Sequence, residues 1–504
     1  MNVEQRNLII MNTFKILSMM LIAAATMSCG DNRPGGGDTP GGETKTSDVQ
    51  TYVTTGDNTM HFDLVGRDFQ EGTNMNFETT IYLKPQTQYQ EFDGFGVALN
   101  GSACYNLMKM TKENREKLLR ETFDPNTGMG YSYTRISIGA SDFSLSDYTC
   151  CDQPGIENFA LTSEETTYII PILKEVLAIN PQLKVMGSPW TCPRWMKVND
   201  LSTKSAYNSW KGGQLNPDYY QDYATYFVKW IKAFEAEGIH IESVTVQNEP
   251  LNRGNSASLF MGWQECRDFV KTALGPAFET AGLTTKILVF DHNYNYDNLS
   301  DQQQYPLKIY GDALAAKYID GAAYHNYGGS PTELDNIHKQ APDKNLYFTE
   351  HSIGTWNYQN FQDALMNDMR DVGMATITRW CKSVIVWNYM LDQERGPYRP
   401  GGCGTCYGLV EINNRDYTTL NRRATYFVIG HLAKALKPGS KRIDVKGYST
   451  NLNIAAAENP DGTYGLVLQN MNDQGITITV DDGTHHFDVV MPAKSITSCV
   501  WKKD

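Results

Sequence analysis

The middle of the chain repeats one pattern: a short apolar run, a polar turn, and then a stretch with the apolar spacing of a helix. Between residues 91 and 423 this order recurs eight times, and each apolar run has the length of a buried strand. The predicted strands are 92–99, 133–139, 184–190, 243–248, 286–291, 321–324, 345–349 and 383–388. Amphipathic stretches such as 162–179 and 218–237 separate them, the first beginning with a Thr162/Glu165 capping box.

Eight strands joined by crossover helices predict a closed (β/α)8 TIM barrel of fold class α/β. This barrel spans residues 91–437. Continuously apolar strands belong to a parallel sheet that helices cover, and eight units in about 330 residues suit a barrel better than an open sheet. No GxGxxG motif follows the first strand, so a dinucleotide-binding fold lacks its main support. A miscount by one unit is the alternative.

Both ends of the folded part show strand and hairpin patterns without helices. Residues 438–504 alternate apolar and polar positions from RIDVKGY to ITSCVWK, with turns at NPDG and NDQG. Residues 51–90 add the short runs HFDLVG and TTIYLKP. Because neither segment alone is expected to form a stable β-sandwich, we predict that the two combine into one β-sandwich beside the barrel.

The first fifty residues predict an export signal and a tether. Residues 1–28 contain a lysine, an apolar run too short to span a bilayer, and small residues before Cys29. The TMSC ending resembles a bacterial lipoprotein cleavage box, which implies a lipidated Cys29, with plain secretion as the alternative. The Gly- and Pro-rich residues 29–50 then form a flexible linker. We therefore expect a lipoprotein at the cell surface or in the periplasm, touching the membrane only through its anchor.

Net charge argues against one class of binding partner, and the cysteine content limits the possible disulfides and metal sites. The 44 Lys and Arg against 57 Asp and Glu give a net charge of −13 without a basic block, which argues against nucleic acid. Ten cysteines leave nine once Cys29 is set aside, an odd number that argues against a fully paired framework. Cys403 and Cys406 form a lone CxxC in GGCGTC, and without a second pair they indicate a local disulfide or two free thiols rather than zinc.

Two glutamates follow apolar runs at places where a barrel carries its chemistry. Glu249 precedes Pro250 in VTVQNEP after the fourth predicted strand, and Glu350 ends LYFTE after the seventh. In a (β/α)8 barrel the carboxyl ends of all strands meet at one mouth, so the two side chains should face each other. A pair of carboxyl groups is what glycosidic bond cleavage needs, at about 5 Å apart for retention of configuration. A solvated rim glutamate is the alternative for either residue alone.

An ordered series of motifs resembles glycoside hydrolase family 30, the retaining β-glycosidases that include glucosylceramidase and endo-β-1,6-glucanase. The series is QEFDGFGVALNGSA, TRISIGASDFS, GSPWTCPRWMK, VTVQNEP, AAYHNY, YFTEHS and VWNYMLD. The resemblance implies a barrel with a β-sandwich from both termini, no cofactor and no metal. It also implies that Glu249 is the general acid/base and Glu350 the nucleophile.

Chemistry supports this division of roles between the two glutamates. Glu249 should have a raised pKa, from an apolar mouth and from the charge of Glu350. Arg135 should lie beside Glu350 and keep it ionised, with a structural ion pair as the alternative.

The remaining motif positions resemble a cradle for the sugar. The implied substrate-binding residues, besides Arg135, are Asp142, Trp190, Asn248, His325, Tyr327 and Trp387. Asn248 would bond the 2-hydroxyl, and Trp387 would lie under the ring. Core packing or a structural hydrogen bond is the alternative for each.

One segment departs from the family. After the eighth strand glucosylceramidase-like members carry a Gly-Gly-Pro loop, whereas this chain has DQERGPYRPGGCGTCYG, with Arg395 and Arg399. That loop faces the leaving-group side in the family, so the leaving-group preference is the property in doubt.

We expect a monomeric retaining hydrolase that cleaves β-D-glucosidic bonds, most readily an endo-β-1,6-glucanase. Glucosylceramidase or a broad β-glucosidase or β-xylosidase is the alternative. Two other classes stay open: a metal-dependent hydrolase using His292, His325 and His351, although HExxH is absent, and a carbohydrate-binding protein without catalysis.

Overall fold

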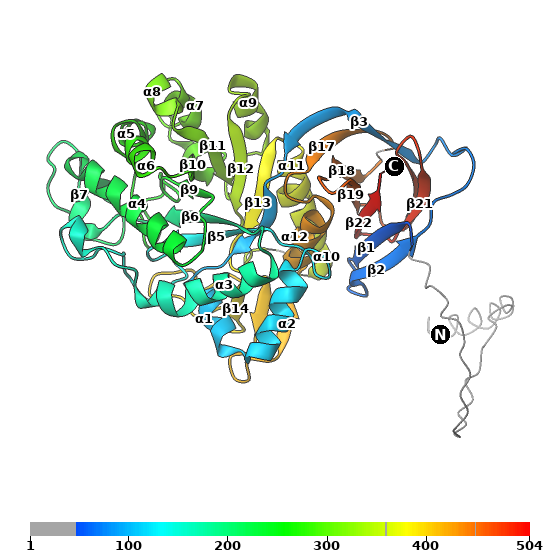
Figure 1. Ribbon diagram of the computed structural model, residues 1–504, viewed down its shortest axis with the longest axis horizontal. Coiled ribbons are helices and arrows are strands. Elements are labelled where there is room, and N and C mark those ends of the chain that lie inside the picture. The colour runs from blue at the N-terminus through cyan, green and yellow to red at the C-terminus, as the bar shows by residue number, and fades with distance from the viewer. Residues whose placement is uncertain (1–46, 358–359, 449, 504) are drawn as a thin grey trace, which may run out of the picture. The chain divides into compact units, whose positions relative to one another are not determined.

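The computed structural model describes residues 47–357, 360–448 and 450–503, and its central element is a closed barrel of eight parallel strands (Figure 1). The barrel strands are β4 (Gly94–Ala98), β5 (Tyr133–Ile138), β6 (Lys184–Pro189), β9 (Ser243–Thr245), β10 (Lys286–Asn293), β11 (Ile319–His325), β12 (Asn345–Glu350) and β13 (Cys381–Val386). Each strand pairs with the next, and β13 closes onto β4. The eight predicted units are therefore confirmed.

Helices surround the barrel, as the crossover connections require. They are α1 (Gly101–Lys109), α2 (Lys112–Phe123), α3 (Ile170–Ile179), α4 (Tyr220–Ala236), α5 (Trp263–Phe269), α6 (Gly275–Ala281), α7 (Tyr305–Tyr310), α8 (Ala313–Ala316), α9 (Thr332–Gln340), α10 (Phe361–Asp368), α11 (Ala375–Ile377) and α12 (Ala424–Ala435). Three π-helical segments continue α3, α5 and α10: η3 (Glu165–Ile169), η6 (Val270–Leu274) and η8 (Met369–Met374). Half of the predicted capping box is present: Glu165 Oε2 accepts from the Thr162 amide at 2.8 Å, while Thr162 Oγ1 accepts from the Glu164 amide at 3.3 Å instead of the Glu165 amide.

Short elements decorate the loops. They are η2 (Ile156–Asn158), η4 (Arg194–Met196), η5 (Pro217–Tyr219), η7 (Tyr296–Asn298), β7 (Lys197–Val198), β8 (Gln214–Leu215), β14 (Met390–Asp392), β15 (Val410–Ile412) and β16 (Leu420–Arg422). Inside the barrel a layer of large and small side chains fills the space: Tyr133, Met186, Leu288, Ala323, Tyr347 and Ile385. The barrel is thus packed solid below its mouth, and chemistry is confined to the loops above.

Both termini build the second domain. Its nine strands run in the order β2-β1-β22-β19-β18-β17-β3-β20-β21. They are β1 (Val49–Thr55), β2 (His61–Arg67), β3 (Thr80–Glu91), β17 (Lys441–Gly447), β18 (Leu452–Glu458), β19 (Thr463–Asn470), β20 (Ile476–Asp481), β21 (His486–Met491) and β22 (Ser495–Lys502). The predicted joint β-domain is confirmed, and β3 inserts between β17 and β20, parallel to the latter. Residues 49 and 50, predicted to belong to the linker, are part of β1.

Helix α12 joins this sheet to the barrel. The buried His431 of α12 hydrogen-bonds Ser498 Oγ at 2.8 Å through Nδ1 and Thr54 Oγ1 at 2.9 Å through Nε2. Thr54 and Ser498 lie on the paired strands β1 and β22. The first and last strands of the domain are therefore tied to the same helix.

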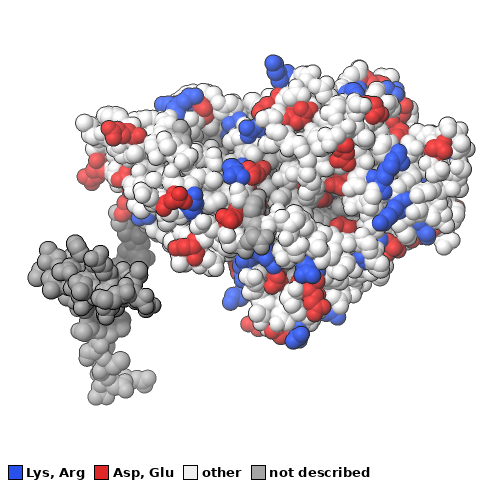
Figure 2. Space-filling model, turned by 180° about the vertical axis from the view of Figure 1, so that it is seen from behind, with Lys and Arg blue, Asp and Glu red and all other residues white. Residues whose placement is uncertain are grey.

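The described surface carries charges of both signs. Figure 2 shows basic and acidic side chains interspersed over the visible face, without a broad basic patch. None of the described helices combines the length and apolar character needed to cross a bilayer. The predicted signal segment, Cys29 and residues 29–46 of the linker lie outside the described residues.

Candidate active site

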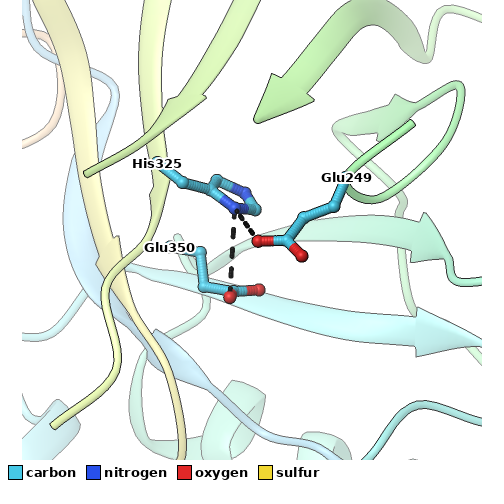
Figure 3. Close-up of side chains that lie close together, drawn as sticks. All are labelled: Glu249, His325 and Glu350. Carbon is cyan, nitrogen blue, oxygen red and sulfur yellow. Dashed lines mark hydrogen bonds and ion pairs between the residues drawn. The ribbon is translucent and has the colours of Figure 1, made fainter. Parts of the chain in front are cut away.

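The two predicted glutamates meet at the carboxyl end of the barrel. Glu249 lies in the loop after β9, and Glu350 is the last residue of β12. Figure 3 shows both pointing toward His325, the last residue of β11. One oxygen of each carboxylate and one ring nitrogen lie within 4.8 Å of one another. This spacing fits retention of configuration, which uses carboxyl groups about 5 Å apart.

Glu350 is held by donors on both oxygens. Arg135, fully buried in β5, donates from Nη1 to Oε2 at 2.6 Å, and the Tyr327 hydroxyl donates to Oε1 at 2.9 Å. A guanidinium at this distance stabilises the ionised carboxylate. Glu350 is therefore held in orientation by two donors, and Arg135 lies beside it as the sequence analysis expected.

His325 lies beneath the carboxylates rather than in the cavity. Its Nδ1 is 3.3 Å from Glu249 Oε1 and 3.9 Å from Glu350 Oε1, while Nε2 is 3.0 Å from Asp291 Oδ1. Burial lowers its pKa, but the charges of Glu350 and Asp291 and the hydrogen bonds outweigh burial and raise the pKa to about 9. Both ring nitrogens therefore face protein carboxylates, and the contact of His325 with sugar stays a prediction.

Glu249 corrects a second expectation. Burial raises the pKa of Glu249, but the hydrogen bond from His325 and the positive charges of His292 and His325 outweigh burial, so the pKa lies below its ordinary value. Asn252 and Asn255 also donate to Oε2, at 2.9 and 3.1 Å. The raised pKa that we expected is thus wrong for this arrangement, because the cationic imidazole was not foreseen.

Asp291 is the central residue that the sequence analysis missed. Fully buried in β10, it accepts from Arg135 Nη2 at 2.7 Å, Thr349 Oγ1 at 2.6 Å and Ser188 Oγ at 2.9 Å, besides its contact with His325. Burial raises its pKa, but Arg135 and His325 lower it far more, so Asp291 stays ionised. Its place at the end of the fifth predicted strand was the available signal.

The backbone is strained at this point. Glu249 has φ +43° and Asp291 has φ +61°, values that side chains other than glycine rarely adopt. Such conformations persist where the surrounding structure enforces them, and they gather at functional sites. Two of the site's carboxylates therefore project from enforced left-handed backbone.

A cavity of about 290 Å³ opens above the carboxylates. Its walls are Asp142, Trp190, Glu249, Asn252, Asn255, Asn293, Tyr327, Glu350, Ser352, Trp356, Trp387 and Cys406. Trp190 and Trp387 stack with ring centroids 5.1 Å apart. Four predicted sugar contacts line the cavity, namely Asp142, Trp190, Tyr327 and Trp387. The other three, Arg135, Asn248 and His325, are buried and do not line the cavity, and their contact with sugar stays a prediction.

The side chains of Asn248 and Asp142 differ in their hydrogen-bond partners. Asn248 Oδ1 accepts from Arg135 Nη2 at 2.8 Å, so Asn248 braces the arginine. Asp142 Oδ1 is buried without a hydrogen-bond partner among the described residues. Burial, followed by the charges of Glu350 and Glu249, raises the pKa of Asp142 to about 8. An unpaired carboxyl on a cavity wall suits a sugar hydroxyl.

The loop after β13 reaches the cavity through its disulfide. Cys403 and Cys406 are bonded, which decides between the two predicted alternatives, and the other seven cysteines of the described chain are free and buried. Arg395 Nε donates to the Gly404 carbonyl at 2.7 Å, and Arg399 Nε to the Ser141 carbonyl at 2.8 Å. Both arginines therefore brace this loop through its backbone and that of a neighbouring loop.

The three histidines of the metal hypothesis do not gather. His292 Nε2 is 3.2 Å from Asp297 Oδ1, and His351 Nδ1 is 2.9 Å from Asn326 Oδ1. Within the described residues, the one cluster with ligand spacing is Glu249, His325 and Glu350. Both Glu350 oxygens already accept from Arg135 and Tyr327, so the cluster has the partners of a charged hydrogen-bond network.

Family models cover almost all of the folded chain. A model described as glycosyl hydrolase family 30 TIM-barrel domain matches residues 92–436, and one described as glycosyl hydrolase family 30 beta sandwich domain matches residues 439–499. The chain belongs to glycosyl hydrolase family 30. It is therefore a glycoside hydrolase, and the architecture and the enzyme class predicted from the sequence are confirmed.

Proteins similar to this family 30 hydrolase include endo-1,6-β-glucanases and glucosylceramidases. The chain is 31% identical to endo-1,6-beta-D-glucanase BGN16.3 of Trichoderma harzianum, over 82% of this chain and 84% of that protein. It is 28% identical to lysosomal acid glucosylceramidase of Mus musculus, over 84% of this chain and 83% of that one. Among solved structures, the endo-beta1,6-glucanase BT3312 superimposes with a TM-score of 0.89 at 58% identity, covering 91% of this chain and all of that one.

Proposed function

We propose that this family 30 hydrolase is an endo-β-1,6-glucanase that retains anomeric configuration. The observation that carries the linkage is the 58% identity to a solved endo-beta1,6-glucanase across 91% of this chain. The mechanism is supported by the spacing of Glu249 and Glu350, which matches the roughly 5 Å of retaining glycosidases and is shorter than the roughly 6.5–9.5 Å of inverting ones.

In this mechanism Glu350 is the nucleophile and Glu249 the acid/base. A Glu350 oxygen attacks the anomeric carbon as the bond to the leaving oxygen breaks, and that oxygen takes a proton from Glu249. Ionised Glu249 then takes a proton from water, whose oxygen displaces Glu350 from the anomeric carbon. Arg135 and Tyr327 hold Glu350 in position for both steps.

The proton for the leaving oxygen is held by the Glu249–His325 pair. His325 is protonated near neutral pH, and its Nδ1 lies 3.3 Å from Glu249 Oε1. When the proton moves to Glu249, neutral His325 keeps its Nε2 proton directed at Asp291. The lowered pKa of Glu249 and the raised pKa of His325 are therefore two descriptions of one shared proton.

The alternatives are glucosylceramidase, a broad β-glucosidase or β-xylosidase, and binding without catalysis. The purified enzyme should be assayed on β-1,6-, β-1,3- and β-1,4-glucans, xylan and glucosylceramide, with and without a chelator. We expect β-1,6-glucan to yield a ladder of oligosaccharides whose first-formed reducing ends are β, at an unchanged rate with chelator. Faster cleavage of glucosylceramide, release of glucose alone, or binding without products would contradict the proposal.

We also propose that the protein is exported as a monomer and tethered to a bacterial membrane through lipidated Cys29, as cleavage after residue 28 implies. Its spacer then leaves the hydrolase free to act on polysaccharide outside the cell. Mass spectrometry of the mature protein should find a diacylglyceryl group on Cys29, and Cys29→Ala should release the enzyme from membranes. An unmodified N-terminus in the membrane fraction would contradict the anchor.

A further inference from the structure

A second cavity of about 560 Å³ lies directly beside the catalytic one. Tyr327, Ser352 and Trp356 line both cavities, so the two share a wall. The far side is formed by His351, which follows Glu350 in the chain, and by Asp368 at the end of α10. We call this space the side cavity; no step of the mechanism above uses it.

The side cavity contains a pair of buried polar atoms without partners. His351 Nε2 and Asp368 Oδ1 each lack a hydrogen-bond partner among the described residues, although the two side chains are 8% and 1% exposed. The two atoms are 3.6 Å apart, which is too far for a hydrogen bond to each other. Buried polar atoms are normally paired, so an adjacent unpaired couple on a cavity wall indicates a ligand group.

The other atoms of both side chains are engaged, which fixes the orientation of the couple. Asp368 Oδ2 accepts from Thr425 Oγ1 at 2.5 Å, and His351 Nδ1 is 2.9 Å from Asn326 Oδ1. Because Asn326 Oδ1 can only accept, Nδ1 carries the proton, and in that tautomer Nε2 accepts as Asp368 Oδ1 does. A vicinal pair of hydroxyls that donates one proton to each atom therefore satisfies both. Hydroxyl groups in adjacent positions are the common feature of neutral sugars.

The shared wall supplies flat aromatic surface. Trp356 is 52% exposed and Tyr327 is 42% exposed, unusually high fractions for side chains of this size. Aromatic faces with a few placed polar groups are the usual lining of ligand sites. Acidic Asp368 and Asp371 on the opposite wall disfavour an anionic sugar, although Asp371 is paired with Arg370 at 2.6 Å.

We propose that the side cavity is a second glycosyl subsite, which binds the neutral sugar unit next to the one being cleaved. This inference rests on the proposed function, because it places a neighbouring unit of the same chain. A 1,6 linkage carries an exocyclic methylene and therefore one more rotatable bond than other linkages, so the chain can turn from one cavity into the other. The couple of His351 and Asp368 binds its hydroxyls, and Trp356 packs against the ring.

The test compares substrates of different length. For each enzyme, kcat/KM is measured on β-1,6-linked gluco-oligosaccharides and on an aryl β-glucoside, which lacks a second sugar. Asp368→Asn turns the accepting oxygen into a donor at constant size, and we expect the ratio of oligosaccharide to aryl glucoside kcat/KM to fall about 5- to 10-fold, mainly through KM. Trp356→Ala, whose side chain is half exposed, should lower the same ratio and covers the case in which Asp368→Asn fails to fold.

Glu164→Gln is the matched control. Glu164 is also buried, with Oε2 accepting from the Leu145 amide at 2.8 Å and Oε1 without a partner, but it lines neither cavity. The Glu164→Gln variant should have the same ratio of oligosaccharide to aryl glucoside kcat/KM as the wild type. An equal fall on both substrates for Asp368→Asn would show a positioning role toward Glu350, and an unchanged ratio would show an empty cavity; either result overturns the subsite.

The proposed function is judged separately, by the wild type alone. If the wild type cleaves another β-glucan rather than the β-1,6-linked chain, the linkage proposal fails, and the same ratios are measured with oligosaccharides of the glucan that it cleaves.

Discussion

The two ends of the barrel both bury carboxylates, but they balance the charge differently. At the amino ends of the strands Asp93 is 3% exposed and lies among three lysines, with Lys184 Nζ at 2.9 Å, Lys382 Nζ at 3.5 Å and Lys286 Nζ at 3.7 Å. Burial raises the pKa of Asp93, but the lysine charges lower it more. Negative charge at this end is therefore fully compensated.

At the carboxyl ends three carboxylates share one permanent cation. Glu249, Asp291 and Glu350 surround Arg135 and His325, so three negative charges face two positive charges when His325 is protonated and only one when it is not. Compensated charge stabilises the amino end of the barrel. At the carboxyl end, a deficit of positive charge keeps a proton mobile beside the substrate cavity. The difference between the ends shows that the barrel separates stability from chemistry along its axis.

The largest expected effect comes from removing the nucleophile at the carboxyl end. Glu350→Ala should lower kcat by about 10⁴-fold or more, because no covalent intermediate can form. Added azide should restore turnover of an activated aryl β-glucoside and yield the α-glycosyl azide, which NMR identifies. A β-azide, or activity that survives the substitution, would remove Glu350 from this role.

Glu249→Gln should show a strong dependence on the leaving group. On β-1,6-glucan, which needs a proton at the leaving oxygen, we expect kcat/KM to fall about 10³-fold. On a dinitrophenyl β-glucoside formation of the intermediate needs no proton, so that first step should be nearly as fast as in the wild type, as burst kinetics measures. Equal losses of that step and of glucan cleavage would contradict the acid role.

Matched substitutions at the two ends sharpen the comparison directly. Asp291→Asn should lower kcat about 10²-fold and move the alkaline limb of the pH–rate profile to lower pH, because the charge of Asp291 helps to raise the pKa of His325. Asp93→Asn should leave kcat and the pH profile unchanged but lower the free energy of unfolding by about 2 kcal/mol, since it removes the carboxylate that pairs with Lys382 and is nearest to Lys184. If both variants lost only stability, the division between the ends would be wrong.

The last comparison is the pH dependence of stability, which should have opposite signs at the two ends. The folded-state pKa of His325 is raised, so its contribution of about 3 kcal/mol is present at low pH and is lost as pH rises through about 9. The pKa of Asp93 is lowered, so its contribution is present near neutral pH and is lost as pH falls through that lowered value.

Denaturant unfolding at several pH values measures both limbs. His325→Gln should remove the alkaline loss, and Asp93→Asn should remove part of the acid loss. A His325→Gln variant that kept the full alkaline loss would place the titrating group elsewhere.

Several site residues could be predicted because their position follows from strand periodicity. Glu249 and Glu350 follow apolar runs, and the closed barrel carries both ends to one mouth. Asp291 ends an apolar run in the same way, but it was passed over because the sequence does not distinguish a carboxylate at the cavity wall from one behind it.

The sequence by itself determined the eight-strand order, the joint terminal β-domain and the placing of the carboxylates at the mouth, because alternation and strand length are local properties of the chain. Only the tertiary structure decided that His325 lies behind the cavity wall, that Glu249 has a lowered pKa and that an unpaired couple lines the side cavity. Those properties depend on distances of a few ångströms between residues remote in the chain, and electrostatic interaction and burial both change steeply over such distances.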